Sequence, residues 1–499
     1  MDELIEHTEI KEQNKEAQPS SDSSTAIETG IVSERELSKE LGFKEALSIG
    51  LGGTIGGGVF SVLGIAAGFA GPAVILSFGI GGVLAILIGY SYSKLALRYQ
   101  SAGGSYTYCR EAFGKHFGGA FGWLLWTGYL ASCALYAYTF GSFFTHMILG
   151  EEASPLTVKI VSAVLASTLI ILSTVINLVG VKETGKSQNI IVLIKVIILV
   201  GFVAITIPAA IKGASENLTP FFGFTDETYS VKRDWLSGLA MAIVGTSILY
   251  VAFEGMELIP NASEEIQNPE KNIPRSIYGT VIIAVVLYLL VAFTALGGTD
   301  YRIFVEDPEA AEYALAIAAR PVLKEAGFII ITLGALFSTA SAFNASLYGS
   351  SRMTYVMARE GIFPKFFQTV SKKNRVPFIS ILIISTITLI FTVVLDLGQI
   401  ARLASSIFLL LFAIISLSSL VLRKEIKANF IFPLIGFIMA FSLLGIFIWN
   451  LIKDVILEVS QGIYNKSLLT AILLPSLIIV MSIGSIVTIK IKSKNKTKS

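Results

Sequence analysis

The sequence predicts an all-α membrane protein with twelve transmembrane helices. Hydrophobic residues make up 53% of the 499 residues and charged residues only 15%, whereas a typical soluble domain has about 25% charged residues. The mean hydropathy is +0.72, and the apolar residues gather into runs of the roughly 20 residues that a helix needs to cross a bilayer. No run alternates like a barrel strand, so we expect a helical bundle.

The predicted helices follow one another along most of the chain. The apolar runs lie near 46–69, 72–97, 117–149, 157–179, 188–211, 236–259, 277–297, 326–350, 377–395, 400–422, 430–452 and 467–490. Residues 1–44 hold eleven acidic and five basic residues, lack a secretory signal, and predict a disordered tail. With this tail in the cytoplasm, cytoplasmic segments carry 27 Lys and Arg residues and outer segments 10. Both termini are therefore predicted to be cytoplasmic.

The first run is rich in glycine at its centre. Six of the eleven residues from Gly50 to Phe60 are glycine, and each glycine disfavours a continuous helix by about 1 kcal/mol. One interpretation is close packing of helices through small residues. The other, which the consecutive Gly56, Gly57 and Gly58 favour, is a break that exposes backbone N–H groups able to bind a carboxylate.

The sixth run is interrupted in a similar place. Glu254, Gly255, Glu257 and Pro260 stand where an apolar helix should continue, and a carboxylate in lipid is costly unless it faces protein or water. We favour a structural role for Glu257 and a functional role for Glu254. Interrupted helices in matching positions predict an inverted-repeat transporter with its binding site between them.

Polar residues in two further runs are candidates for coupling transport to the movement of a proton or another ion. Lys195 lies about seven residues into the fifth run, where it either snorkels to the surface or gains and loses a proton in a desolvated site. In the eighth run, Ser338, Ser341 and Asn344 either bond to neighbouring helices or form a coupling site near Lys195. We expect Tyr129 and its neighbours Tyr136 and Tyr138 to be packing or interfacial aromatics.

Several function classes lack support. The two cysteines and three histidines are too scattered for a disulfide framework or a metal site. The sequence has no Walker loop, nucleophile elbow or His-Glu-x-x-His motif, which argues against an ATP-driven pump or a membrane hydrolase. We expect no enzyme activity, no cofactor and no nucleic-acid partner.

Four stretches resemble the amino acid–polyamine–organocation permeases, which share the LeuT-type fold. They are GTIGGGVF at 53–60, SAGGSYTYCREAFG at 101–114, NASEEIQNPEKNIPR at 261–275 and SRMTYVMAREGIFP at 351–364. The resemblance covers residues 40–422. It implies a transport core at 45–422 built from two inverted five-helix repeats, about 45–211 and about 236–422, followed by two additional helices and a basic cytoplasmic end in 423–499.

The resemblance also implies a substrate site. The substrate carboxylate would meet the N–H groups of Gly57 and Gly58, in the same turn as Gly56, and the ammonium would meet the carbonyl groups of Thr54, Val251 and Glu254. Phe253 is the nearest aromatic candidate for a gate, although alignment on Gly255 places the usual gate at Val251. Lys195, with Ser338 and Ser341, resembles the site of proton-coupled members, in which the lysine replaces a sodium ion.

The predicted function is therefore proton-coupled amino acid symport by alternating access in the plasma membrane, with the amino acid, protons and the lipid bilayer as partners. The alternative is an exchanger of amino acids or polyamines with the same fold. The broken-helix pair argues against a channel, and the lack of a sizeable soluble domain argues against a receptor. We expect neutral or broad substrate specificity, with cationic substrates second.

Overall fold

The computed structural model describes residues 41–101, 103–150, 153–179, 185–222, 235–371, 374 and 376–460. In this part of the chain the regular secondary structure is helical, apart from one isolated bridge between Leu41 and Ile266. Eight of its helical stretches are long and apolar enough to cross a membrane. The all-α class is thus confirmed, whereas the N-terminal tail up to residue 40 and the twelfth predicted run lie outside the described residues.

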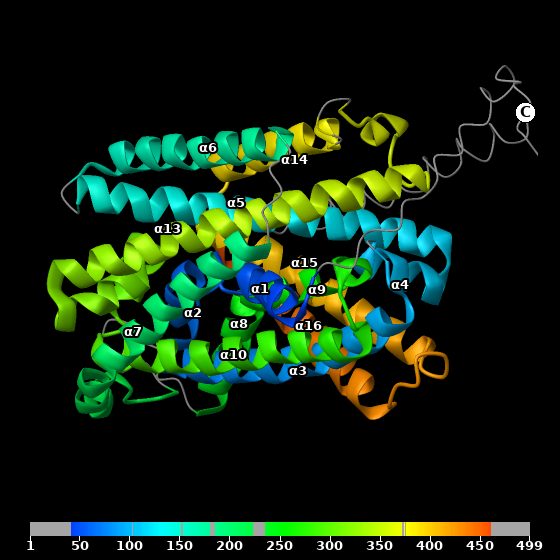
Figure 1. The fold of residues 1–499 in the computed structure, drawn as a ribbon. Coiled ribbons are helices and arrows are strands. Elements are labelled where there is room, and N and C mark those ends of the chain that lie inside the picture. Colours follow the sequence, from blue (N-terminus) through cyan, green and yellow to red (C-terminus); the bar gives the residue numbers. More distant parts are fainter. Residues whose placement is uncertain are drawn as a thin grey trace, which may run out of the picture. The chain divides into compact units, whose positions relative to one another are not determined.

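The first eleven predicted runs fall on helical elements (Figure 1). In chain order these elements are α1 (Phe43–Thr54), η1 (Gly58–Val62), α2 (Leu63–Ala70), α3 (Val74–Arg98), α5 (Lys115–Leu149), α6 (Pro155–Val179), α7 (Gly185–Asn217), α8 (Trp235–Leu249), η3 (Tyr250–Glu257), α9 (Leu258–Asn261), α10 (Pro269–Gly298), α13 (Ala314–Arg359), α14 (Phe378–Val394), α15 (Leu397–Val421) and α16 (Ile431–Ser460). Shorter connecting elements are η2 (Gly71–Ala73), α4 (Gly104–Phe113), η4 (Ser263–Glu265), α11 (Ile303–Glu306), α12 (Pro308–Glu312) and η5 (Lys365–Gln368).

Local sequence signals account for several helix ends. Gly114 separates α4 from α5 with φ of 85°, a left-handed conformation that favours glycine. Asp396 caps α15 by accepting a hydrogen bond from the Gln399 backbone, and the Gln399 side chain accepts one from the Asp396 N–H, which is a capping box. Lys324 has φ of 53° within α13, so the straight part of that helix begins near the predicted start at 326.

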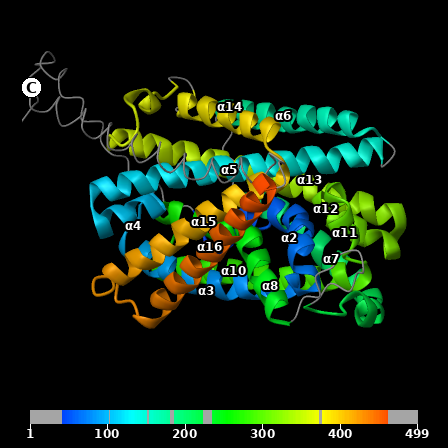
Figure 2. The same cartoon turned by 180° about the vertical axis from the view of Figure 1, so that it is seen from behind.

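The interrupted elements lie in the interior of the bundle. The helix α5 packs against α6, α13 and α15, while α10 packs against α3 and α7. Between these two groups lie α1, α2, α8 and α9 (Figures 1 and 2). The short elements are therefore enclosed by long helices, and this enclosure positions their ends at the centre of the bundle.

The outer helices expose apolar side chains. On α6, Ile160, Val164, Ile171 and Val175 are all exposed, and their spacing places them on one face of the helix. An exposed apolar stripe of this length is typical of a lipid-facing helix surface.

Candidate functional site

The first interrupted helix changes its winding at the glycine-rich turn. The last turn of α1 ends at Thr54, Ile55 has φ of −80° and ψ of 72°, and the chain resumes as a π-helical segment at Gly58. The Gly56 N–H donates to the Thr54 carbonyl at 2.9 Å. This geometry turns carbonyl groups at the end of α1 away from the helix ladder and makes them available to other helices.

Lys195 binds two of those carbonyl groups. Its side chain is fully buried, and Nζ donates to the carbonyl oxygens of Gly52 at 2.8 Å and Ile55 at 2.9 Å. The lysine therefore points into the bundle and not to the membrane surface. The interpretation of Lys195 as a snorkelling anchor is thus wrong.

Ser338 shares one of these acceptors. Its hydroxyl donates to the Ile55 carbonyl, so α7 and α13 both hold the end of α1. Ser341 lies on the same helix, three residues further along, and is 5% exposed. The structure thus brings Lys195 and Ser338 to one carbonyl oxygen.

The second interruption takes the form of a 3-10 helix, η3, and touches the first one. A Cβ added to Gly255 would lie 2.0 Å from the Thr54 nitrogen, and one added to Gly58 would lie 2.6 Å from the Ala252 Cα. Both distances are shorter than any real Cβ contact. The two interrupted stretches are therefore in backbone contact, which only glycine permits at these positions.

The predicted substrate residues surround this contact. Gly56 and Gly57 face Tyr136 of α5, and the Val251 N–H donates to the Ser405 hydroxyl at 3.0 Å. Phe253 is buried against α3 and α10, where its ring lies 5.4 Å from that of Tyr288. It does not line the cavity described next, so the structure does not bring this gate candidate together with the other predicted residues.

A narrow cavity with no room for a water molecule lies beside the contact. Its lining residues are Gly53, Tyr129, Glu254, Gly255, Leu258, Ser346 and Phe408. Glu254 accepts hydrogen bonds from the hydroxyl groups of Ser132 and Tyr136, both on α5. The Glu254 side chain therefore faces α5 and the cavity and not lipid.

Glu257 lies one helical turn beyond Glu254 and has different neighbours. It is 1% exposed, and its Oε1 accepts a hydrogen bond from Ser105 of α4 at 2.9 Å. Its Oε2 has no hydrogen-bond partner among the described residues. This carboxylate joins η3 to α4, and the structural role favoured for Glu257 from the sequence stays a prediction.

Three contacts were missed by reasoning from the sequence. The Tyr288 hydroxyl of α10 donates to the carbonyl of Thr54 at 2.6 Å and to that of Ala252 at 3.1 Å, and so joins the two stretches. Ser405 of α15 contacts η3. Tyr136 does more than pack, because it binds Glu254. The spacing of Ser132 and Tyr136, four residues apart, was a signal for a polar face on the third run.

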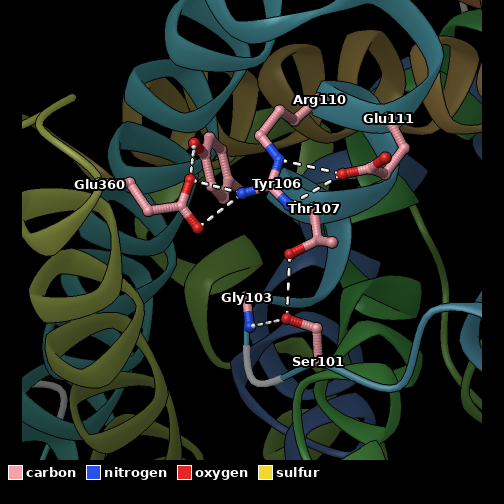
Figure 3. A network of polar contacts seen from close by, with 7 residues as sticks. All are labelled: Ser101, Gly103, Tyr106, Thr107, Arg110, Glu111 and Glu360. Carbon is pink, nitrogen blue, oxygen red and sulfur yellow. Dashed lines mark hydrogen bonds and ion pairs between the residues drawn. The ribbon is translucent and has the colours of Figure 1, made fainter.

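A polar network joins α4 to the end of α13 (Figure 3). Arg110 Nη1 donates to both carboxylate oxygens of Glu360, at 2.6 and 2.7 Å, and the Tyr106 hydroxyl donates to Oε2 at 2.6 Å. Arg110 also bonds Glu111 of its own helix. Burial, followed by the hydrogen bond to Glu360, raises the pKa of the Tyr106 hydroxyl. This network closes one end of the bundle, which we call the α4 end.

Replacing Glu360 by glutamine is expected to loosen the α4 end. Arg110 and Glu360 are about one third exposed, so the lost ion pair is worth up to about 1 kcal/mol. A cysteine introduced by Ser346→Cys, with Cys109 and Cys133 replaced, measures how readily a thiol reagent reaches the interior of the bundle. Its alkylation rate should rise up to about fivefold in the Glu360 variant. Glu111→Gln is the matched control, because Glu111 bonds Arg110 without joining two helices. Equal rates in both variants would contradict a closing role.

The opposite end of the bundle carries a second polar contact, at α12. Glu312 accepts hydrogen bonds from Tyr138 at 3.2 Å and from Ser142 at 3.0 Å, both on α5. Burial raises the pKa of the Glu312 carboxyl to about 7. The connection between α10 and α13 is thus tied to α5 by a group that titrates near neutral pH.

The α12 contact is expected to tighten as the pH falls. An exposed glutamate has a pKa of about 4.3, so the docked form binds the proton more tightly, and lowering the pH from 8 to 6 should stabilise docking by up to about tenfold. Amide hydrogen exchange across 309–316 measures this change. Glu312→Gln should remove the pH response, while Glu309→Gln, an exposed change on the same helix, should keep it. If the pH response of hydrogen exchange persists in Glu312→Gln, another group causes it and this prediction is wrong.

Comparison with known proteins adds an independent finding. A model of the family described as "Amino acid permease" matches residues 45–498. An uncharacterised protein of Methanocaldococcus jannaschii is 32% identical over 82% of this chain and 90% of its own. The methylthioribose transporter of Bacillus subtilis is 29% identical over 83% and 88%. The branched-chain amino acid permease BcaP of the same species is 25% identical over 79% and 82%.

Proposed function

Because the chain belongs to the amino acid permease family, and is therefore a membrane transporter and not an enzyme, we propose that it is a proton-coupled amino acid symporter. It works by alternating access across the plasma membrane. In this proposal α1 to α7 and α8 to α15 contain the two inverted five-helix repeats, and the substrate binds where the two interruptions meet.

The observation that carries the proposal is the position of Lys195. A protonated Nζ donates to the carbonyl oxygens of Gly52 and Ile55 and holds the end of α1 with a charge. Loss of the proton weakens both hydrogen bonds, since bonds from a charged donor are about twice as strong as neutral ones. The proton thereby controls how firmly α1 is held, and a fixed ammonium at this place repels sodium.

The substrate would be held mainly by the main chain. The N–H groups of Gly57 and Gly58 start the second half of the first interrupted helix, where the helix dipole favours a carboxylate. The carbonyl groups of Thr54, Val251 and Glu254 are the proposed acceptors for the substrate ammonium. Ser338 and Ser341 complete the coupling site beside Lys195.

The two ends of the bundle supply the gates in this proposal. With both termini in the cytoplasm, the α4 end faces the cytoplasm and the α12 end faces outward. The network of Arg110 and Glu360 would then break for release, and the Glu312 contact would break for entry. Alternating access requires that the two contacts break in turn.

Uptake by purified protein in proteoliposomes tests the proposal. A labelled amino-acid mixture is offered under an inward proton gradient, under an inward sodium gradient, and without a gradient but with unlabelled amino acids inside. Accumulation that depends on the proton gradient alone is the expected result. Uptake that requires internal substrate and ignores both gradients would instead identify an exchanger.

A further inference from the structure

The connection between α15 and α16, residues 423–429, carries cations next to exposed apolar side chains. We propose that this connection and the adjoining end of α3 bind the headgroup of an anionic phospholipid, such as phosphatidylglycerol, while the acyl chains of that lipid lie against α16. The inference goes beyond the proposed function, because it assigns a lipid site to the outer surface of the bundle.

Two polar contacts hold the connection against one face of α3 (Figures 1 and 2). The Asn429 N–H donates to the Tyr90 hydroxyl at 2.7 Å. Arg98 Nη2 lies 3.0 Å from Glu425 Oε1. Tyr90, Lys94 and Arg98 follow one another at intervals of four residues and therefore share a face of the helix. Lys94 thus lies between the two contacts, on the face that meets the connection.

The cations on this surface outnumber the carboxylates. Glu425, the carboxylate of the connection, is already paired with Arg98. Four further cations, which we call the α16 cluster, form no ion pair with any residue that the structure describes: Lys94, Arg423, Lys424 and Lys427. Unpaired charges of one sign repel each other, and an anion bound among them removes that repulsion.

Aromatic rings order two side chains of the α16 cluster. Lys94 Nζ lies 5.9 Å from the centroid of the Tyr90 ring, and Arg423 Cζ lies 5.1 Å from that of Phe430. Cation–π contacts at this distance are attractive. They orient the two cations in advance, which reduces the entropy lost when a ligand binds. The guanidinium of Arg423 also offers the planar fork of donors that matches a phosphate group.

The neighbouring apolar surface favours a lipid over a soluble anion. Phe430, Ile431 and Phe432 at the start of α16 are each about half exposed. The Phe432 ring lies 5.1 Å from that of Tyr90, so apolar surface of α16 continues up to α3. A phospholipid uses the cations and this surface together, whereas a soluble anion uses the cations alone. In the proposed orientation the cluster faces the cytoplasm, where anionic lipids give the membrane surface its negative potential.

Thermal unfolding of the purified full-length protein in a neutral detergent tests the site. A ligand that binds the folded state raises the unfolding temperature as its concentration increases. Dioleoyl phosphatidylglycerol and dioleoyl phosphatidylcholine differ in headgroup charge and share their acyl chains. We expect phosphatidylglycerol to bind at least tenfold more tightly than phosphatidylcholine. Inorganic phosphate, which has the charge but no acyl chain, should leave the unfolding temperature unchanged at the same concentration.

A triple glutamine variant locates the binding. Lys94→Gln, Arg423→Gln and Lys427→Gln together remove three cations of the α16 cluster and keep the pair between Arg98 and Glu425. Each cation near an anionic lipid contributes about fivefold to binding, so the affinity for phosphatidylglycerol should fall about 100-fold.

A second triple variant controls for net charge. It replaces by glutamine three exposed lysines outside the α16 cluster, namely Lys159, Lys271 and Lys365. The loss of charge is the same, but the affinity for phosphatidylglycerol should stay within about threefold of the wild-type value.

Equal binding of phosphatidylglycerol and phosphatidylcholine would overturn the site, and so would full binding of phosphatidylglycerol by the cluster variant. Equal losses in the two triple variants would assign the attraction to net charge and would also overturn it. Stabilisation by inorganic phosphate alone would show a site for a soluble anion and not for a lipid. If the cluster variant does not fold, Lys94→Gln takes its place, with an expected fivefold loss of affinity.

Discussion

Replacing Lys195 by alanine is expected to abolish amino acid accumulation driven by an inward proton gradient. Among the described residues, Lys195 is the only charged side chain that donates hydrogen bonds to the carbonyl groups of Gly52 and Ile55, and the change removes it. The buried Gly52 carbonyl then loses its charged donor, at a cost of about 1–3 kcal/mol, whereas the Ile55 carbonyl keeps the hydrogen bond from Ser338. Uptake into proteoliposomes should no longer respond to the pH difference across the membrane, while exchange of internal for external substrate should continue.

Lys159→Ala is the matched control for this experiment. Lys159 lies on the exposed face of α6, so its loss removes a lysine without touching α1, and proton-driven accumulation should persist. Exchange by the Lys195 variant shows that it is folded and binds substrate. Continued pH-dependent accumulation by that variant would disprove the coupling role of Lys195.

Gly255→Ala is expected to separate the two interrupted stretches and eliminate transport. The new Cβ would lie 2.0 Å from the Thr54 nitrogen and 2.3 Å from the Gly53 carbonyl carbon. Both are backbone atoms and cannot turn aside as a flexible side chain would. The overpacking should lower the free energy of unfolding by about 1–3 kcal/mol and displace the carbonyl groups proposed to bind the substrate.

Gly201→Ala on α7 separates this effect from a general intolerance of glycine substitution. A Cβ at Gly201 meets nothing within 4 Å, so this variant should unfold at or above the wild-type temperature and keep full uptake. Thermal unfolding and uptake are measured for both variants. Wild-type uptake by Gly255→Ala would show that the contact between the stretches is not required for transport.

Much of this site was predictable from the chain alone because its signals are local. Three consecutive glycines in the first run, and carboxylates in the sixth, contradict the composition of a lipid-spanning helix. Lys195 contradicts it in the same way. Local exceptions of this kind identify the segments that form the candidate site, although not their mutual geometry.

The contacts that were not predicted from the sequence depend on side chains that are unremarkable in their own helices. Tyr288 lies in an apolar run, where tyrosine is unremarkable, and its role as a bridge to Thr54 requires knowing that α10 crosses the end of α1. Phe253 was a gate candidate by sequence proximity, yet the winding of η3 directs it towards α3 and α10. A sequence does not reveal the rotation of a 3-10 segment about its axis.

The backbone contact between the two interrupted stretches also bears on how such transporters diversify. In the proposed site, recognition through main-chain groups applies to the atoms that every amino acid has in common, and the close backbone contact leaves no room for a side chain at Gly58 or Gly255. The cavity walls come partly from other helices, such as Tyr129 on α5, Ser346 on α13 and Phe408 on α15. Under the proposed function, substitutions on those helices would therefore alter the cargo while the main-chain anchoring is retained.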